Sequence, residues 1–334
     1  MKHWFLWGLV SVVFQSCSQP TPVNQNPNIT ADNLVEEIAK QVKHYPSERI
    51  YGLGYSNNNC YFDMFINDIK VHTFPGRGLI GSTAVEVNQL LPHSGKYTIS
   101  YKMYPLYTLE EEGKTVTLNT LVDSSYVALD VYSYNLKDKN EGDIFYAKYG
   151  TPNIAIKNAQ GDTIYKFAGA GKTYYEGSFE VELDVPYQLQ PPFATAQDLR
   201  KMDQKQLMTK LLAKYKEVWQ IYKNRELDNI ARLEFDMLKD YAVSHYATKE
   251  VIKKNWDFLY DNYKNTSFEI QPLANYKLEF FADGKLVALM LDTKDNKIRG
   301  NTALWIKLKD EENTPVFFNR YFYIPQGETE FKVY

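Results

Sequence analysis

The sequence predicts a mainly β protein with an α insert, in which two antiparallel β-sandwich-like domains are joined by a helical segment. Apolar and polar residues alternate in many short segments between residues 50 and 185 and again after residue 276, a pattern typical of strands. Residues 204–263 repeat apolar residues at helical spacing instead. The 27 tyrosines and 18 phenylalanines also favour strands, because aromatic side chains fit a half-buried sheet face.

Residues 1–16 have the composition of a secretory signal peptide. Met1-Lys2-His3 is a short basic start, and an apolar run follows from Trp4 to Phe14. A transmembrane anchor is the alternative, but crossing a bilayer core of about 30 Å needs about 20 apolar residues. We therefore expect residues 1–16 to be a leader that is removed.

The end of this leader, Phe14-Gln15-Ser16-Cys17, resembles the lipobox of bacterial lipoproteins. The resemblance implies cleavage before Cys17 and lipid attached to that residue, where two or more acyl chains would hold the protein firmly at a membrane. Phe14 stands where these families usually carry Leu, so an ordinary secretory signal is the alternative. We expect a lipid-anchored protein of the bacterial cell envelope, at the outer membrane, on its periplasmic face or at the cell surface.

Two short regions are expected between the leader and the first sandwich. Residues 17–29 are polar and rich in proline, a composition that cannot bury enough apolar surface to fold, so they are expected to be a flexible tether. Residues 30–46 are expected to be an N-terminal helix that ends at Pro46. Its apolar residues fall on one face: Leu34, Val35, Ile38 and Val42.

Residues 47–190 are predicted to form the larger β-sandwich domain. Asn67-Asp68 separates two apolar runs and predicts a two-residue hairpin turn. Gly161-Asp162 predicts a second hairpin, between segments 154–156 and 163–165. Many short strands separated by turns are typical of an antiparallel sandwich.

Residues 191–264 are predicted to be the helical segment, in three helices. Asp203 and Gln206 have the spacing of a capping box at the start of the first helix. The apolar and aromatic stripe of these helices is interpreted as core packing, with a groove for a partner as the alternative.

Residues 265–334 are predicted to be a smaller β-sandwich domain, in which Asp283-Gly284 turns a hairpin. The segments 65–71 and 280–286 share a pattern, as do 91–99 and 324–331. These likenesses are explained either by an internal duplication or by the general similarity of hairpins.

No metal or cofactor site is predicted, because the candidate ligands lack the spacing that such sites need. No two of the four histidines of the mature chain lie at metal-ligand spacing, and Asp292, Asp295 and Asn296 lack the pattern of a calcium loop. The acidic run Glu110-Glu111-Glu112 is interpreted as an exposed hairpin end. The four histidines are His44, His72, His93 and His245.

No catalytic or nucleotide-binding motif is predicted either. Gly169-Ala170-Gly171-Lys172-Thr173 lacks the first glycine and the following helix of a phosphate loop. Cys60 lies in a strand-like setting without a histidine at a recognisable spacing, so it is expected to be a buried apolar residue. The sequence therefore favours a protein that is not an enzyme.

The net charge of −3 argues against nucleic acid as a partner, since a basic surface would be needed.

A second resemblance rests on the leader through Cys17 and on four strand-forming segments, which are Phe65–Val71, Leu91–Met103, Leu278–Leu291 and Tyr323–Val333. In these the chain is similar to immunity lipoproteins, which protect bacteria from toxins delivered by neighbouring cells. The resemblance implies a non-catalytic protein-binding module, although it assigns no toxin-contact residue. A structural or assembly lipoprotein is one alternative, and a glycan-binding or hydrolytic protein with dispersed carboxylates is another.

Overall fold

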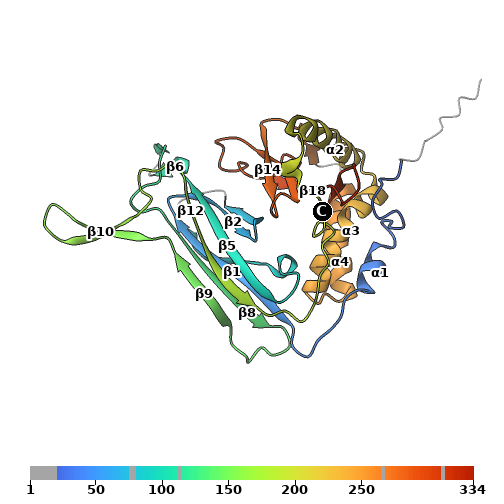
Figure 1. Ribbon diagram of the computed structural model, residues 1–334, viewed down its shortest axis with the longest axis horizontal. Coiled ribbons are helices and arrows are strands. Elements are labelled where there is room, and N and C mark those ends of the chain that lie inside the picture. The colour runs from blue at the N-terminus through green and yellow to red at the C-terminus, as the bar shows by residue number, and fades with distance from the viewer. Residues whose placement is uncertain (1–20, 75–79, 112–113, 265–267, 310–312) are drawn as a thin grey trace, which may run out of the picture.

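The computed structural model describes residues 21–74, 80–111, 114–264, 268–309 and 313–334. Its architecture is mainly β, with several antiparallel sheets and a helical segment in the middle of the chain, as the sequence predicts. In Figure 1 a lobe built mainly from strands lies beside a second lobe built from helices and the C-terminal strands. We call them the sandwich lobe and the mixed lobe.

The sandwich lobe contains two four-stranded antiparallel sheets. One has the strand order β4-β1-β8-β9 and the other the order β12-β5-β2-β3. The strands are β1 (Arg49–Asn58), β2 (Tyr61–Ile66), β3 (Ile69–Phe74), β4 (Ile80–Glu86), β5 (Gly95–Tyr104), β8 (Tyr126–Asn135), β9 (Ile144–Gly150) and β12 (Tyr175–Leu183).

Alternation along the strands builds the core between these two sheets. Every second residue is buried from Tyr97 to Met103 in β5 and from Val127 to Ser133 in β8, and the residues between them are at least partly exposed. The inward apolar residues of β8 belong to the same buried cluster as Ile99 and Tyr101 of β5. The period of two in the sequence therefore corresponds to a real division between the two faces of each sheet.

Local turn chemistry fixes the hairpin between β2 and β3. Asn67 and Asp68 both adopt positive φ angles, of 45° and 63°. This is the conformation that a two-residue turn needs between twisted antiparallel strands, and Asn and Asp tolerate it better than most residues. The predicted hairpin is confirmed.

Two further hairpins extend from the sandwich lobe. They are β6 (Tyr107–Glu111) with β7 (Lys114–Leu118), and β10 (Asn153–Lys157) with β11 (Thr163–Phe167). The β10–β11 hairpin confirms the turn predicted at Gly161-Asp162. It projects away from the rest of the molecule in Figure 1.

Three helices follow in the mixed lobe, α2 (Gln204–Asn224), α3 (Leu227–Ser244) and α4 (Lys249–Lys264). The side chain of Asp203 caps α2 by accepting a hydrogen bond from the Gln206 amide at 2.8 Å, as the spacing predicts. Arg225 ends the helix in the left-handed conformation, with a φ of 57°. The 3-10 turns η1 (Asn88–Leu90) and η2 (Leu199–Lys201) complete the helical elements.

The C-terminal strands form two more antiparallel sheets, of order β14-β15-β18-β19 and β13-β16-β17. The predicted hairpin at Asp283-Gly284 joins β14 to β15, with positive φ angles at both residues. The strands are β13 (Phe268–Ile270), β14 (Tyr276–Phe281), β15 (Leu286–Leu291), β16 (Trp305–Leu308), β17 (Pro315–Phe317), β18 (Phe322–Tyr323) and β19 (Lys332–Val333).

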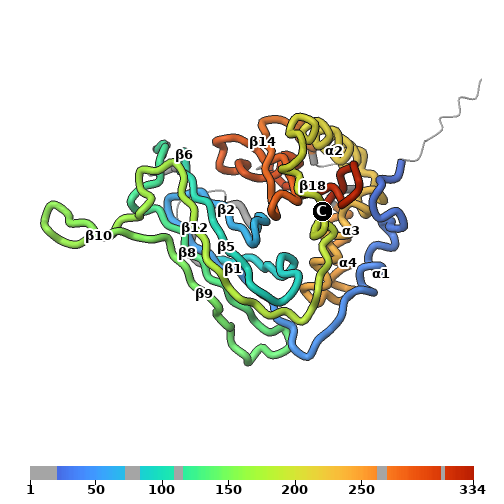
Figure 2. The backbone as a smooth tube through the Cα atoms, in the orientation of Figure 1, coloured from blue at the N-terminus to red at the C-terminus, as the bar shows by residue number. Residues whose placement is uncertain are grey.

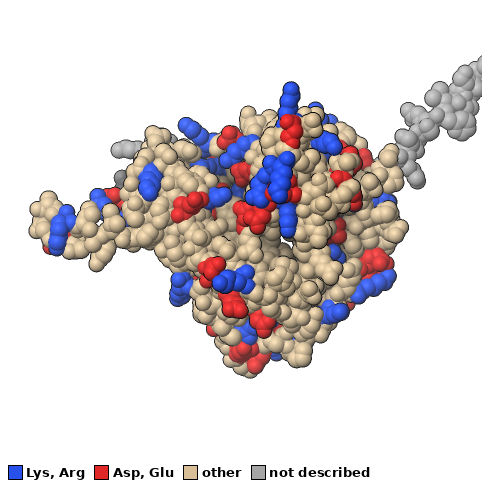
Figure 3. Space-filling view, in the orientation of Figure 1, with Lys and Arg blue, Asp and Glu red and all other residues tan. Residues whose placement is uncertain are grey.

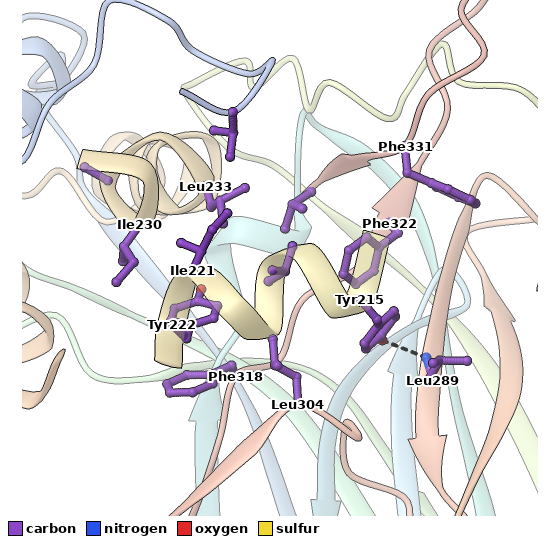
Figure 4. Close-up of a cluster of buried hydrophobic side chains, with 14 of the residues drawn as sticks. Tyr215, Ile221, Tyr222, Ile230, Leu233, Leu289, Leu304, Phe318, Phe322 and Phe331 are labelled. Carbon is purple, nitrogen blue, oxygen red and sulfur yellow. Dashed lines mark hydrogen bonds between the residues drawn. The ribbon is translucent and has the colours of Figure 1, made fainter. Parts of the chain in front are cut away.

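The helices and the C-terminal strands share one hydrophobic core. The hydroxyl of Tyr215 on α2 accepts a hydrogen bond from the Leu289 amide of β15 at 2.7 Å, and the ring of Tyr222 stacks on Phe318 at 4.5 Å (Figure 4). This single cluster of buried residues extends from Val23 to Val333. The apolar helix stripe is therefore core, and the domain boundaries drawn from the sequence stay a prediction.

Strands β2 and β15 are buried on both faces, because the two lobes pack against each other there. One face of β15 lies in the core shared with the helices, while Ala288 and Met290 on the other face belong to a small cluster with Phe65 of β2. The opposite face of β2, with Phe62 and Met64, lies in the core of the sandwich lobe.

The expected flexible tether at residues 17–29 is wrong for residues 23–29. Val23 and Ile29 are buried in the core of the mixed lobe. The side chain of Gln25 exchanges two hydrogen bonds with the main chain of Val333, of 2.7 and 2.9 Å. Figure 2 shows this N-terminal segment beside the C-terminal end of the chain. Two apolar anchors, the bonded Gln25 and the hydrogen bonds of Asn26 to Arg232 and Asp236 thus hold a polar, proline-rich segment in place.

The N-terminal helix expected over residues 30–46 is present but shorter. Helix α1 spans Leu34–Ala39, with Leu34 and Ile38 buried against the other helices. The side chain of Asn33 at its start forms no capping hydrogen bond within the helix. The predicted helix is therefore correct in place but wrong in length, since residues 40–46 lie outside it.

Candidate binding surface

Cys17, the expected lipidation site, lies outside the described residues. The described chain begins at Thr21, whose carbonyl accepts a hydrogen bond from the side chain of Asn229 on α3 at 3.0 Å. The amide of Val23 donates to the same Asn229 side chain at 3.1 Å. The chain is therefore already fixed to the mixed lobe four residues after Cys17.

Cys60, the second cysteine, is completely buried, as predicted. Its thiol lies 3.3 Å from the carbonyl oxygen of Tyr126. Burial raises the pKa of Cys60 to about 12, because the thiolate would lose its hydration. A neutral, buried thiol is a packing residue.

The described histidines are dispersed. His44 pairs with Glu48 at 2.9 Å, His93 lies on an exposed turn, and His245 is buried with Nε2 3.6 Å from Glu86. Burial lowers the pKa of His245. The side chain of His72 lies outside the described part, and within that part no three His, Cys, Asp or Glu residues are grouped as a metal would require.

The other sequence candidates are structural where they are described. The glycine-rich segment 169–173 is a turn between β11 and β12, tied to Leu121 by two main-chain hydrogen bonds of 2.8 Å. The acidic run at 110–112 has its side chains outside the described residues.

The polar turn near Asn296 joins the two lobes. The Asn296 side chain donates to the carbonyls of Leu106 and Thr108 in the sandwich lobe. Three residues later, the Arg299 guanidinium lies 3.9 Å from the ring centre of Tyr61 and donates to the Pro105 carbonyl at 3.1 Å. The Tyr61 hydroxyl in turn donates to the Arg299 carbonyl at 2.6 Å. We call this set of contacts the Arg299 clamp.

The β10–β11 hairpin carries several exposed apolar side chains, including Tyr165, the most exposed large apolar residue described in the sandwich lobe. Tyr165 is 72% exposed and Ile154 is 51% exposed. Strand register places Ile156 opposite Ile164, so Ile154, Ile156 and Ile164 lie on one face of the hairpin and Tyr165 on the other. Both faces therefore present apolar groups.

Few charged side chains cover this hairpin in the space-filling view (Figure 3). Each of its strands pairs only with the other among the described strands, so both outer edges carry unpaired main-chain groups. Strand β9, whose Phe145 is 56% exposed, lies at the edge of its sheet just before the hairpin. Together they form a surface that can bind another protein through side chains or strand pairing.

No family model, curated protein or solved structure matches this chain. Among the described residues, no helix is long and apolar enough to cross a membrane. Geometry and sequence alone therefore bear on the function.

The exposure of the hairpin is not evident from the sequence, although its turn is. Ile-Ala-Ile paired with Ile-Tyr is equally typical of a strand buried inside a sheet. Apolar side chains on both faces of a strand normally require burial on both sides, so this pattern in an isolated hairpin indicates a surface that another protein can cover.

Proposed function

We propose that this chain is a lipid-anchored, non-catalytic protein-binding module of the bacterial envelope. Lipid on Cys17 attaches it to the membrane, and the β10–β11 hairpin binds the partner protein. The observation that carries the proposal is the exposure of apolar side chains on both faces of this projecting hairpin.

The form of the hairpin defines the kind of partner. A two-stranded hairpin with a side chain such as Tyr165 in water gains stability when its faces are covered. Isoleucines on one face and a tyrosine on the other fit a groove that encloses the hairpin better than a flat surface. The partner is therefore a protein with an apolar cleft, and a toxin neutralised by an immunity protein is the form that the family resemblance favours.

Site-specific photo-crosslinking in the source bacterium tests this function. A photoreactive residue at Tyr165 is expected to give a discrete adduct with a second protein, whereas one at Lys205, exposed on α2, gives none. Adducts of equal yield at both positions would contradict a specific surface. An adduct of twice the mass of the chain would assign the hairpin to self-association instead.

Matched variants then separate binding from folding. Ile154→Ser combined with Ile164→Ser should lower the adduct yield at least about tenfold. The partner covers only the exposed part of each side chain, about half of it, and full burial of an isoleucine contributes roughly 1.5–3 kcal/mol. Val116→Ser on the β6–β7 hairpin, also at an exposed β-branched residue, should leave the yield unchanged.

If the partner is a toxin, deletion of the chain should sensitise cells only when that toxin is present.

A further inference from the structure

A cavity of about 750 Å³ lies where the two lobes meet. Strand β3 and turn η1 of the sandwich lobe form one side of it. Helices α3 and α4, strand β15, the loop of residues 297–302 and residues 317–321 with Tyr334 form the rest. A volume in the range of about 300–1,000 Å³ is typical of sites that enclose a small molecule. The face in Figure 3 is hollowed between the lobes.

Most of the wall of this cavity is apolar. The helical side carries methionine, leucine and phenylalanine side chains, which adapt readily to a flexible hydrocarbon. Phe258 of α4 lines the cavity although it is 70% exposed, so its ring lies at the opening. The apolar lining residues used in this argument are Ile69, Leu90, Met237, Leu238, Phe258 and Met290.

All the charged side chains of the wall are basic: Lys70, Lys297 and Arg320. Acidic side chains balance two of these charges. Lys70 lies 3.4 Å from Asp63, and Arg320 makes a bidentate ion pair with the buried Glu234. Lys297 is exposed and forms no ion pair with any described residue. The wall therefore carries about one positive charge that no acidic side chain balances.

We propose that the interlobe cavity binds a single-chain amphipath with a monoanionic head, a long-chain carboxylate. The hydrocarbon chain lies against the helical wall, and the carboxylate lies near Lys297. One uncompensated cation matches one negative charge. This site is separate from the hairpin surface, so the two proposals succeed or fail independently.

Displacement of a fluorescent fatty acid, dansyl-undecanoate, from residues 18–334 tests the proposal, since this chain contains every described residue. We expect one probe to bind per chain and laurate to displace it. Methyl laurate, which lacks only the charge, should bind about threefold more weakly, as expected for a partly solvated ion pair. Equal affinity for acid and ester would overturn the anionic head.

Two pairs of variants locate the site. Lys297→Gln should abolish the preference for acid over ester, whereas Lys294→Gln, in the same loop but outside the cavity wall, should keep it. Phe258→Ser should weaken both ligands about tenfold through lost apolar contact, and Phe145→Ser, at a comparably exposed ring, should not.

Unchanged probe affinity in Phe258→Ser and in the cavity-filling variant Leu238→Trp would place the probe elsewhere and overturn the site. Phosphatidylglycerol vesicles that displace the probe as well as laurate does would assign a two-chain lipid, which also overturns the proposal. Circular dichroism and the unfolding temperature show whether each variant is folded.

Discussion

Cys60 lies between the sheets of the sandwich lobe, and its burial decides its chemistry. Because its pKa is raised to about 12, the thiolate that reacts with disulfide reagents is scarce at pH 8. An unfolded cysteine has a pKa of about 8.5. The native thiol is therefore expected to react with an aromatic disulfide reagent at least about a thousandfold more slowly than the unfolded thiol.

The measurement is the labelling rate of residues 18–334 at pH 8, with and without denaturant. Ala159→Cys, at the exposed tip of the β10–β11 hairpin, is the control and should react within minutes in the native state. Native Cys60 reacting as fast as that control would show that the thiol is accessible. The sequence could predict burial here, since an apolar strand surrounds the residue.

Single residues could be predicted where the cause is local. The Asp203 cap and the Asn67-Asp68 turn depend on atoms within three residues along the chain, so their spacing in the sequence suffices. Gln25 and Arg299 could not be predicted in this way. Their partners, Val333 and Tyr61, lie more than 200 residues away.

At the scale of elements, alternation predicts a strand but not what covers its faces. Strands β5 and β8 alternate in burial as their sequences do. Strands β2 and β15 are buried on both sides because the lobes meet there. The segment of residues 23–29 shows the reverse case, in which a polar composition predicts disorder and two buried side chains order it.

The Arg299 clamp should contribute measurably to the docking of the lobes. Arg299→Ala removes a cation–π contact with Tyr61 and a hydrogen bond to Pro105. The expected loss in the free energy of unfolding is about 2 kcal/mol. For a chain of this size that lowers the unfolding temperature by about 3 °C.

Scanning calorimetry of residues 18–334 measures this loss. Lys297→Ala, in the same loop but exposed, is the control and should leave the unfolding temperature unchanged. Equal temperatures for Arg299→Ala and the unaltered chain would mean that the other interlobe contacts, the apolar cluster around Phe65 and the Asn296 hydrogen bonds, suffice to join the lobes.

At the scale of the whole molecule, the sequence predicts the class of fold but not the interlobe surfaces. The cavity has walls from β3, η1, α3, α4, β15 and the C-terminal residues, and no local pattern indicates that these elements meet. The hairpin surface is likewise defined by what does not cover it. The cavity therefore arises from packing between distant segments, and the hairpin surface from the absence of such packing around a local element.

The attachment of Thr21 to Asn229 sets how far the body can lie from the membrane, if Cys17 carries lipid. Four residues extended at about 3.4 Å each reach only about 14 Å. The Thr21 end of the mixed lobe should thus lie next to the lipid headgroups, with the β10–β11 hairpin farther away (Figure 1).

Lipidation itself has a separate test. Cys17→Ser should release the protein from membranes, and mass spectrometry of the mature form should show the acyl adduct.

Energy transfer to headgroup acceptors measures this orientation in liposomes. A donor at Gln220→Cys, which lines the same surface groove as Thr21, should be quenched more strongly than a donor at Ala159→Cys. A twelve-residue Gly-Ser insertion after Ser18 should reduce the quenching at position 220, because the linker then no longer holds that end at the surface. Equal quenching at both positions without the insertion would show that Thr21 does not fix the body beside the bilayer.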